Sequence, residues 1–379
     1  MPFLETDRAV CDKLLPDLRQ RLAELPLAEL EAEDSPAIEI FRAHGGTNLL
    51  VPAAYGGLDA SPLDACRVIR ALAAQAPSMT VATMMHHFSL GTLFAVAELL
   101  GDGSDLEEIL LRRVVEQRLL VASGFAEGRT QQGILSPTMT AAQVPGGFLV
   151  NGSKKPCSLS SSMDLLTASV GMAQPDGTVA MGLLMLPANT PGVSIHPFWS
   201  TFALAGAESN EVRLTDVLVT PEQIIAPDAS LADAMTELTT VGLIWFQMTV
   251  CAGYTGIASA LVEQVLERGR GSASDRAALA VRIESAAALT EGLARRIIAG
   301  ETDNDGLAAA LVTRFAVQDA IAATVNQAVE LLGGMAYIGS SDVAYLAAAS
   351  HCIAFHPPSR TSTVDALLDY YKGYPMVVE

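Results

Sequence analysis

A short segment near the C-terminus holds the residues best suited to chemistry. His356 stands in Phe355-His-Pro-Pro-Ser-Arg-Thr-Ser362, and an imidazole titrates close enough to neutral pH to move protons. Arg360 in the same segment can hold a phosphate or a carboxylate through two parallel hydrogen bonds. Each also has a plain structural interpretation, as a packing histidine before two prolines and as half of a surface salt bridge. The segment is therefore a candidate site, with both interpretations open.

Two adjacent histidines form a second candidate, and the cysteines form none. His86 and His87 fall in a predicted helix, where a buried, hydrogen-bonded structural role competes with a place beside a cofactor. The five cysteines are scattered and contain no Cys-x-x-Cys pair, so we expect neither a metal site nor a disulfide framework. Free cysteines and an N-terminus without a basic and apolar leader predict a cytoplasmic protein.

Composition limits the partners of the 379-residue chain, which is long enough for two or three packed subdomains. Its net charge of −19 and the lack of a Lys/Arg-rich tract argue against nucleic acid. The stretch from Leu238 to Val262 carries no charge and could span a bilayer by length. Because threonines and a glutamine interrupt it, we interpret it as a buried core helix and expect no membrane partner.

The order of predicted elements defines three domains. Helical periodicity occupies residues 1–120, a β insert follows over residues 121–228, and helices return over residues 229–379. Asn151-Gly152 predicts a hairpin turn inside the insert. Since strands and helices do not alternate, a Rossmann fold is excluded. Strands are expected at 165–172, 179–186, 193–197 and 211–219.

Five segments in this order resemble motifs of the acyl-CoA dehydrogenase superfamily. Each alone is only a glycine-rich turn or a strand, but their shared order and spacing cover nearly the whole chain. The resemblance implies a mainly α fold with an N-terminal helical domain, a middle β-barrel or sandwich domain and a C-terminal four-helix bundle. The segments are Leu50-Val-Pro-Ala-Ala-Tyr-Gly-Gly57, Gly124-Phe-Ala-Glu-Gly128, Gly147-Phe-Leu-Val-Asn-Gly-Ser-Lys154, Glu211-Val-Arg-Leu-Thr-Asp-Val217 and Glu330-Leu-Leu-Gly-Gly334.

The resemblance also implies an FAD cofactor and a homodimer or homotetramer. The flavin ring would lie between the β domain and the C-terminal helices, near Ala126, Pro156 and Ser158. The adenosine diphosphate portion would reach a neighbouring subunit, and the arginine for its pyrophosphate is expected near Arg268. The candidate cofactor-binding residues are Phe125, Ala126, Ser158, Ser160, Arg268, Arg270, Glu330, Gly333, Gly334, Arg360 and Thr361.

The catalytic glutamate of that superfamily is missing from both of its usual positions. One position falls at Pro358 or Ser359 and the other at Phe246, and none of these side chains can act as a general base. Gln247 replaces a common arginine of the family. Glu127 lies in the flavin motif, but the family does not use a glutamate there as its base. His356, Ser359 and Gln247 are therefore the candidate catalytic residues.

Three functions remain open on the sequence. The first is a biosynthetic dehydrogenase of secondary metabolism, such as polyketide biosynthesis, acting on an acyl thioester of acyl carrier protein or CoA and passing electrons to a partner protein or to oxygen. The second is a flavin-dependent monooxygenase on the same fold, which needs no carboxylate base but does need a separate flavin reductase. The third is a flavin-binding protein without turnover. Anaerobic reduction of the flavin by substrate distinguishes the first from the other two.

Overall fold

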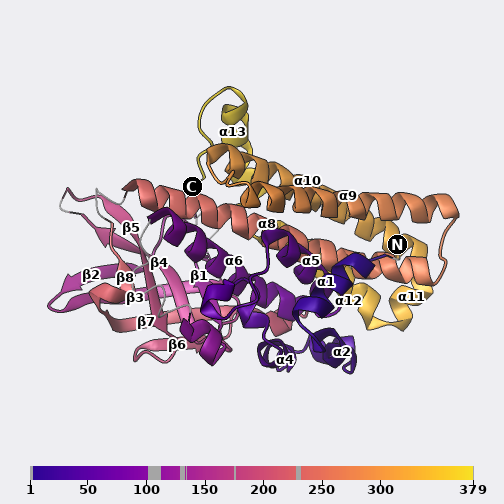
Figure 1. Ribbon diagram of the computed structural model, residues 1–379, viewed down its shortest axis with the longest axis horizontal. Coiled ribbons are helices and arrows are strands. Elements are labelled where there is room, and N and C mark those ends of the chain that lie inside the picture. The colour runs from indigo at the N-terminus through magenta and orange to yellow at the C-terminus, as the bar shows by residue number, and fades with distance from the viewer. Residues whose placement is uncertain are drawn as a thin grey trace.

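The computed structural model describes residues 3–100, 112–128, 133, 135–174, 176–227 and 232–378, and these form helices, then a sheet, then helices (Figure 1). This order confirms the predicted mainly α fold with a β insert. The domain boundaries at 120 and 228 remain proposals, and the second lies outside the described residues. The predicted helix from Leu106 to Gln117 is described only from residue 112 onward.

Among the N-terminal helices, α4 and α5 pack against α6, and α1 packs against α5. α5 begins at Pro62, directly after Ser61, whose hydroxyl accepts a bond from the Asp64 amide and caps the helix. α6 is buried along most of its described length, which places it at the centre of the molecule. The helices are α1 (Glu5–Leu14), α2 (Leu18–Ala23), α3 (Leu27–Leu30), α4 (Ala37–Ala43), α5 (Pro62–Ala73) and α6 (Pro77–Leu100).

The β insert is one sheet in the order β6-β7-β3-β2-β4-β5-β8, with β1 pairing parallel to β4. All four predicted strands are present, as β4, β5, β6 and β7. The short β1, β2 and β8 carry too little alternation to be recognised from the sequence. The strands are β1 (Val121–Gly124), β2 (Thr140–Val144), β3 (Gly147–Cys157), β4 (Leu165–Ala173), β5 (Val179–Pro187), β6 (Val193–His196), β7 (Asn210–Val219) and β8 (Ile224–Ile225).

The hairpin predicted at Asn151-Gly152 is wrong. Both residues lie inside β3, and the turn between β2 and β3 instead uses Gly146, whose φ is +90°. Gly152 has φ +138° and marks a register shift against β7, where an added Cβ would meet Met139 at 2.7 Å. Asn151 bonds across to Asp216 instead of turning the chain. The glycine therefore supports a bulge rather than a turn.

The C-terminal helices form the bundle that Figure 1 shows along the length of the molecule. α8 is apolar on all sides because α5, α6, α9, α10 and α12 pack against it. Two helices, α8 and α10, are long and apolar enough to cross a membrane, but 94% of the α8 window is buried inside the protein, which confirms a core helix there. The helices are α8 (Ala232–Glu267), α9 (Ala273–Ile298), α10 (Asn304–Leu332), α11 (Gly334–Gly339), α12 (Ser341–His351), the 3-10 turn η6 (Cys352–Phe355) and α13 (Arg360–Tyr371).

A buried carboxyl links the three parts of the chain. Glu31, at the end of α3, accepts bonds from the amide and hydroxyl of Ser78 at 3.0 and 2.6 Å and from the Tyr345 hydroxyl of α12. The same hydroxyl accepts from the Leu204 amide of the β insert at 3.0 Å. Burial raises the pKa of Glu31 to about 7 despite these bonds. One carboxyl thus connects the N-terminal helices, the sheet and the bundle.

Candidate functional site

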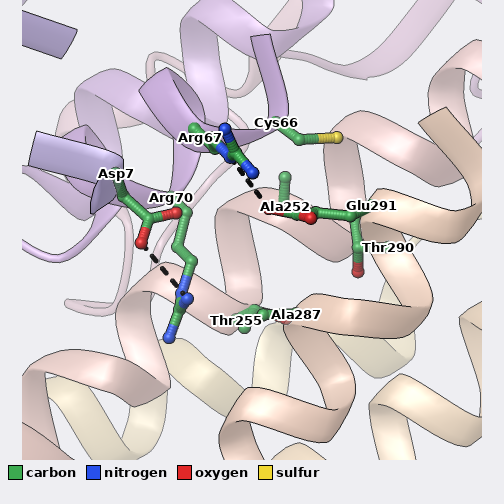
Figure 2. Close-up of a pocket in the computed structure, with 9 residues that line it drawn as sticks. All are labelled: Asp7, Cys66, Arg67, Arg70, Ala252, Thr255, Ala287, Thr290 and Glu291. Atoms are coloured by element: carbon green, nitrogen blue, oxygen red, sulfur yellow. Dashed lines mark hydrogen bonds and ion pairs between the residues drawn. The ribbon is translucent and has the colours of Figure 1, made fainter. Parts of the chain in front are cut away.

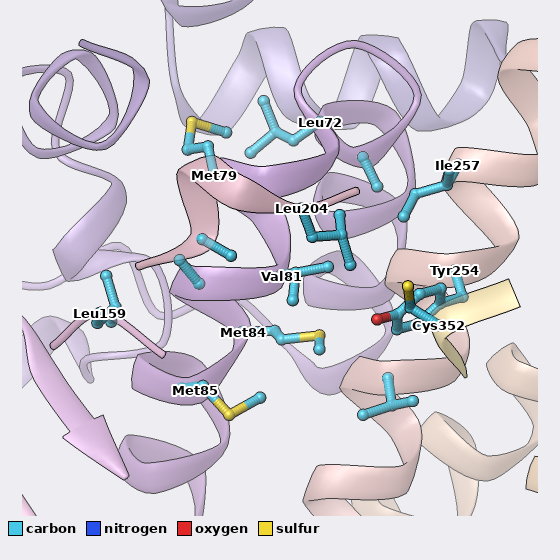
Figure 3. Packing of buried hydrophobic residues seen from close by; sticks show 14 of the residues in the cluster. Leu72, Met79, Val81, Met84, Met85, Leu159, Leu204, Tyr254, Ile257 and Cys352 are labelled. Carbon is cyan, nitrogen blue, oxygen red and sulfur yellow. The ribbon is translucent and has the colours of Figure 1, made fainter. Parts of the chain in front are cut away.

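His356 lies where η6 meets the middle of α8. Its Nε2 is 2.7 Å from the hydroxyl of Tyr254, and its ring packs edge-on against the rings of Tyr254 and Phe246. Phe246 in turn packs against Phe88 of α6. Figure 3 shows the Tyr254 ring beside Cys352 in the core shared by α6 and α8. His356 is half-buried, and one side of its ring lies against an aromatic enclosure that Tyr254, Phe246 and Phe88 build from two domains.

The enclosure keeps the His356 ring neutral. Desolvation, with a smaller contribution from the nearby Arg314 cation, lowers the pKa of His356 to about 3, and burial raises the pKa of Tyr254 well above its ordinary value. Tyr254 therefore keeps its proton and donates it in the hydrogen bond, since its buried hydroxyl has no other acceptor among the described residues. Nε2 of His356 is then the acceptor and Nδ1 carries the ring proton. A ring of such low pKa suits hydrogen-bond donation better than the general-base role that the sequence suggested.

Arg314 supports the backbone just before His356. This side chain of α10 is 1% exposed, and its guanidinium donates to the carbonyl of Ile353 and, at 3.0 Å, to Oε1 of Gln318. No carboxylate pairs with it within the part of the chain that the structure describes. Burial lowers the pKa of Arg314, but an arginine stays charged over the physiological range. The enclosure therefore has an uncompensated positive charge beneath it.

Gln247 bonds the backbone next to His356, whereas the hydrogen bonds of the Ser359 hydroxyl go to Thr361 and Ser362. Gln247 is fully buried on α8, and its Nε2 donates to the carbonyl of Pro357 at 3.3 Å. Ser359 is exposed and caps α13, accepting a bond from the amide of Ser362 at 3.1 Å. The structure thus supports placing Gln247 beside the candidate histidine and gives Ser359 a capping function.

Arg360 and Thr361 are engaged within the chain. The Arg360 guanidinium bonds both carboxylate oxygens of Asp319, at 2.6 and 3.2 Å, and stacks over the ring of Phe315. Thr361 is exposed and lies 3.1 Å from the Ser359 hydroxyl. The surface salt bridge that the sequence left open for Arg360 is therefore present, and an anion would have to displace Asp319.

The β-domain candidates come together on neighbouring strands. The carbonyl of Ala126 accepts from the amide of Lys155 at 2.9 Å, which ties the segment after β1 to the end of β3. Ser158 and Ser209 share a hydroxyl bond of 2.9 Å, and Ser160 donates to the carbonyl of Glu208 at 2.6 Å. Phe125, Ala126 and Ser158 keep part of their surface exposed. This group can line one wall of a flavin site.

Glu127 is neither free nor solvated, because its carboxylate forms a buried ion pair with Lys154 on β3. Both side chains are at most 1% exposed. Thr138 donates to the same carboxylate, and Lys154 also donates to Ser169 at 3.0 Å. The pair fixes the wall of segments 125–127 and 155–158, so Glu127 serves structure and not proton transfer. This pairing could not be predicted from the sequence, because Lys154 lies 27 residues further along the chain, on β3.

His86 and His87 take the structural role that was the plainer alternative. The His86 Nε2 lies 2.9 Å from the carbonyl of Thr47, and its Nδ1 accepts from the amide of Val121 at 3.1 Å, so the ring is a neutral tautomer protonated on Nε2. Burial lowers the pKa of His86 to about 4 and also lowers the pKa of His87 well below its ordinary value. His87 packs edge-on against Phe41. Together they attach β1 to the N-terminal helices.

The remaining candidates gather at the far end of the bundle. Arg268 and Arg270 are exposed in the turn between α8 and α9, where Gly269 and Gly271 have φ of +58° and +73°. Glu330 is exposed at the end of α10, and Gly333 ends that helix with φ +83° before Gly334 begins α11. Twenty-one residues of helix separate the first arginine from Gln247, or about 30 Å. A cofactor bound beside His356 is too far away to contact these residues. They could contact only a cofactor bound at another place.

A small polar cavity lies elsewhere, between α1, α5, α8 and α9 (Figure 2). Arg70 bonds Asp7 there at 3.3 Å, and Arg67 bonds Glu291 at 2.9 Å. The cavity measures about 10 Å³, the space of a single water molecule. It is a structural ion-pair junction and too small for a flavin or a substrate.

One relative matches the chain from end to end. Isobutylamine N-hydroxylase of Streptomyces viridifaciens is 49% identical over 378 residues, covering 100% of each chain. The chain belongs to the family of this N-hydroxylase. The family member described here is therefore an enzyme, a flavin-dependent oxidoreductase on the acyl-CoA dehydrogenase fold.

Solved structures agree on the fold. FMN-bound TdsC from Paenibacillus sp. A11-2 aligns with a TM-score of 0.80 and 16% identity, covering 99% of this chain and 98% of that one. A prolyl acyl carrier protein oxidase aligns with a TM-score of 0.81 and 17% identity, covering 97% and 99%. No protein-family profile matches the chain. At these identities the structures show the fold alone, and they confirm the resemblance to the acyl-CoA dehydrogenase superfamily.

The comparisons weigh differently on the three functions left open by the sequence. A full-length relative that is an N-hydroxylase favours the monooxygenase alternative over the acyl-thioester dehydrogenase. The acyl carrier protein oxidase shares the fold with this chain, and at 17% identity it does not distinguish between these two functions. An oxidoreductase family excludes a purely non-catalytic reading.

Proposed function

We propose that this protein is a flavin-dependent monooxygenase that hydroxylates the nitrogen of a small primary amine. The observation that carries the proposal is the missing carboxylate. Among the described residues, no Asp or Glu makes a hydrogen bond or an ion pair with His356, Gln247 or Tyr254. Removal of an α-proton from an acyl thioester has no base there, whereas oxygen transfer to an amine needs none. The full-length N-hydroxylase relative supports the same reaction class.

The reaction is balanced by a reduced flavin and dioxygen. The amine RNH2, O2 and a two-electron-reduced flavin give the hydroxylamine RNHOH, water and oxidised flavin. One oxygen atom is reduced to water and the other forms the new N–O bond. The two electrons and two hydrogens of the reduced flavin balance the water, and the two N–H hydrogens of the amine balance the N–H and O–H of the product. A separate flavin reductase supplies the reduced flavin in this proposal. When bound, the flavin supplies the electrons and activates the oxygen.

The chain's own residues position the reactants and exclude water. Phe88 and Phe246 provide apolar surface for an alkyl group. A neutral His356, held by Tyr254, presents Nδ1–H as a donor to an oxygen atom that gains charge during transfer. The amine must arrive as its free base because an ammonium nitrogen has no lone pair. The buried Arg314 cation and the apolar rings disfavour the ammonium form, so they favour the reactive one.

The flavin itself is proposed to rest against the wall formed by Ala126 and Ser158. FAD remains our expectation from the sequence, and FMN is the alternative, since a solved structure of this fold holds FMN. The exposed arginines Arg268 and Arg270 serve an adenosine diphosphate portion only if a second subunit brings one. Homodimerisation or homotetramerisation is therefore tied to FAD and would be dispensable with FMN.

The test compares amines with acyl thioesters. We expect purified protein, supplied with a flavin reductase, NAD(P)H and oxygen, to convert a small primary alkylamine such as isobutylamine into a hydroxylamine that is heavier by one oxygen atom in mass spectrometry. Labelled dioxygen should supply that atom. Under anaerobic conditions the oxidised flavin should not be reduced by acyl-CoA or acyl carrier protein thioesters. Anaerobic bleaching by a thioester, without amine hydroxylation, would return the function to a dehydrogenase.

A further inference from the structure

The side chain of Gln247 has a fixed orientation and an unused oxygen. Its amide group approaches the carbonyl of Pro357 at 3.3 Å, and a carbonyl can only accept, so the NH2 group must face it. The other end of the amide, Oε1, is buried and has no hydrogen-bond partner among the described residues. The residue is 0% exposed. The enclosure therefore contains a fixed, unpaired acceptor.

An unpaired buried acceptor weakens a fold, so its retention calls for a physical reason. Gln247 follows Phe246, whose ring packs against His356, and it precedes Tyr254 by two helical turns on α8. Pro357 directly follows His356 in the chain. The acceptor thus lies beside the residues that the proposed reaction uses, and not in a remote part of the core. It is suited to a ligand that brings an N–H or O–H donor.

We propose that Oε1 of Gln247 accepts a hydrogen bond from the N–H of the substrate's primary amine and thereby binds the amine as its free base. This inference rests on the proposed function. A neutral amide oxygen bonds an amine N–H without the charge that would stabilise an ammonium ion, so the nitrogen lone pair stays free. A carboxylate at this position would bind the unreactive cation instead. The substrate class is a primary alkylamine bound as its free base, and a tertiary amine with the same alkyl group lacks the required N–H.

The experiment replaces this oxygen and uses a matched glutamine as the control. Gln247→Met keeps the length of the side chain and removes the acceptor. Gln264→Met is the control, because Gln264 lies on the same helix, also has a buried Oε1 without a partner in the described structure, and is about 25 Å away. We expect Gln247→Met to raise KM for the amine about tenfold or more. kcat should stay within about threefold, and flavin affinity, measured by fluorescence, should be unchanged. The control should match the wild type in all three.

Gln247→Glu provides a second, independent result. The carboxylate should tighten binding of the alkylammonium ion, measured as a thermal shift without turnover, while lowering kcat at neutral pH about tenfold or more. The lost rate should return as the pH rises toward the pKa of the amine. The N,N-dimethyl derivative of the substrate, a tertiary amine, should bind the wild type at least tenfold more weakly than the primary amine, because a site built around an acceptor rejects an analogue that lacks the N–H donor.

The possible outcomes distinguish a failure of the Gln247 inference from a failure of the proposed function. A wild type that hydroxylates amines, together with a Gln247→Met variant of unchanged KM, overturns the inference alone. Weakened flavin binding in Gln247→Met also overturns it, because the oxygen would then serve the cofactor. A wild type that hydroxylates no primary amine overturns the proposed function and the inference together. Should Gln247→Met not fold, the Gln247→Glu profile and the amine series decide.

Discussion

Candidate residues of opposite character lie beside two parts of α8, its middle (the inner end) and its C-terminal turn (the outer end). The inner end, around His356 and Gln247, is enclosed by aromatic rings and contains a neutral imidazole and an unpaired amide oxygen. The outer end, with Arg268 and Glu330, is exposed and sits at turns whose groups are solvated. Enclosed polar groups change their pKa values and select ligands, whereas exposed ones keep ordinary properties. The chemistry of this single chain therefore belongs to the inner end.

The largest expected effect tests the rigidity of the wall next to the inner end. Lys154→Met leaves the Glu127 carboxylate buried without its cation, and we expect the free energy of unfolding to fall by about 3–5 kcal/mol. Lys155→Met is the control, because that neighbouring lysine pairs with Glu211 nearer the surface and should cost less than about 1 kcal/mol. Urea denaturation followed by circular dichroism measures both. Equal losses in the two variants would mean that the buried pair does not hold the wall.

The next effect concerns the donor role of His356. We expect His356→Ala to lower kcat for amine hydroxylation about a hundredfold, since removal of one positioned donor commonly has this size. His351→Ala is the control, because that histidine is exposed at the end of α12. Glu127→Gln is unsuitable for comparison, because it breaks the buried pair with Lys154. A loss below about tenfold, measured by hydroxylamine formation under saturating amine, would make His356 a packing residue.

A smaller effect appears in the pH dependence of stability. His86 and His356 have folded pKa values of about 4 and 3, below the ordinary 6.5, so the unfolded chain binds their protons first as the pH falls. Each histidine should lower the free energy of unfolding by about 1.4 kcal/mol for every pH unit below 6.5, until the pH reaches its folded pKa. Glu31 acts in the opposite direction, because its pKa is raised to about 7 and its contribution is lost as the pH rises from 4.5 to 7.

Two variants isolate these contributions. His356→Gln should flatten the decline between pH 6.5 and 5 by the share of one histidine, and Glu31→Gln should make the decline steeper. Urea titrations at pH 7, 6 and 5 give both slopes. A His356→Gln protein with the slope of the wild type would show that this imidazole is solvated and titrates normally.

The smallest effect is expected at the outer end. Replacing Arg268 and Arg270 together by Ala should change the flavin affinity of a monomeric protein less than about threefold, because exposed charges contribute little. Fluorescence titration with FAD and with FMN, at several protein concentrations, measures this. A loss confined to FAD and to concentrations where the protein associates would show that the outer end serves a neighbouring subunit. A loss in the monomer would contradict the separation of the two ends.

The sequence predicted the architecture better than the site. The central uncharged stretch of α8 was recognisable because a helix packed on all sides needs no polar face. The missing glutamate at Phe246 and Pro358 was equally visible, since absence of a carboxylate needs no geometry. Tyr254 was missed, although it lies two turns from Gln247 on one helix face. Its partner His356 is 102 residues away, and no local pattern reports such a contact.

The remaining failures have a similar cause. Asn151-Gly152 carries the local signature of a turn, but the register of β3 against β7 places a bulge there. The ion pair of Glu127 was not predicted, because its partner Lys154 lies on β3 and is distant in the sequence. Contacts between residues distant in the sequence determine both the bulge and the ion pair, whereas sequence patterns report only local preferences.

The Glu31 carboxyl has a consequence for how the molecule comes apart. It is bonded to the start of α6 and to Tyr345 of α12, and through that hydroxyl to the amide of Leu204 in the β insert. If one of the three parts detaches, the network around the buried carboxyl loses hydrogen bonds. Partial unfolding therefore costs free energy in the parts that stay folded. The chain should therefore melt cooperatively, in a single calorimetric transition whose van't Hoff and measured enthalpies agree, instead of shedding its domains one after another.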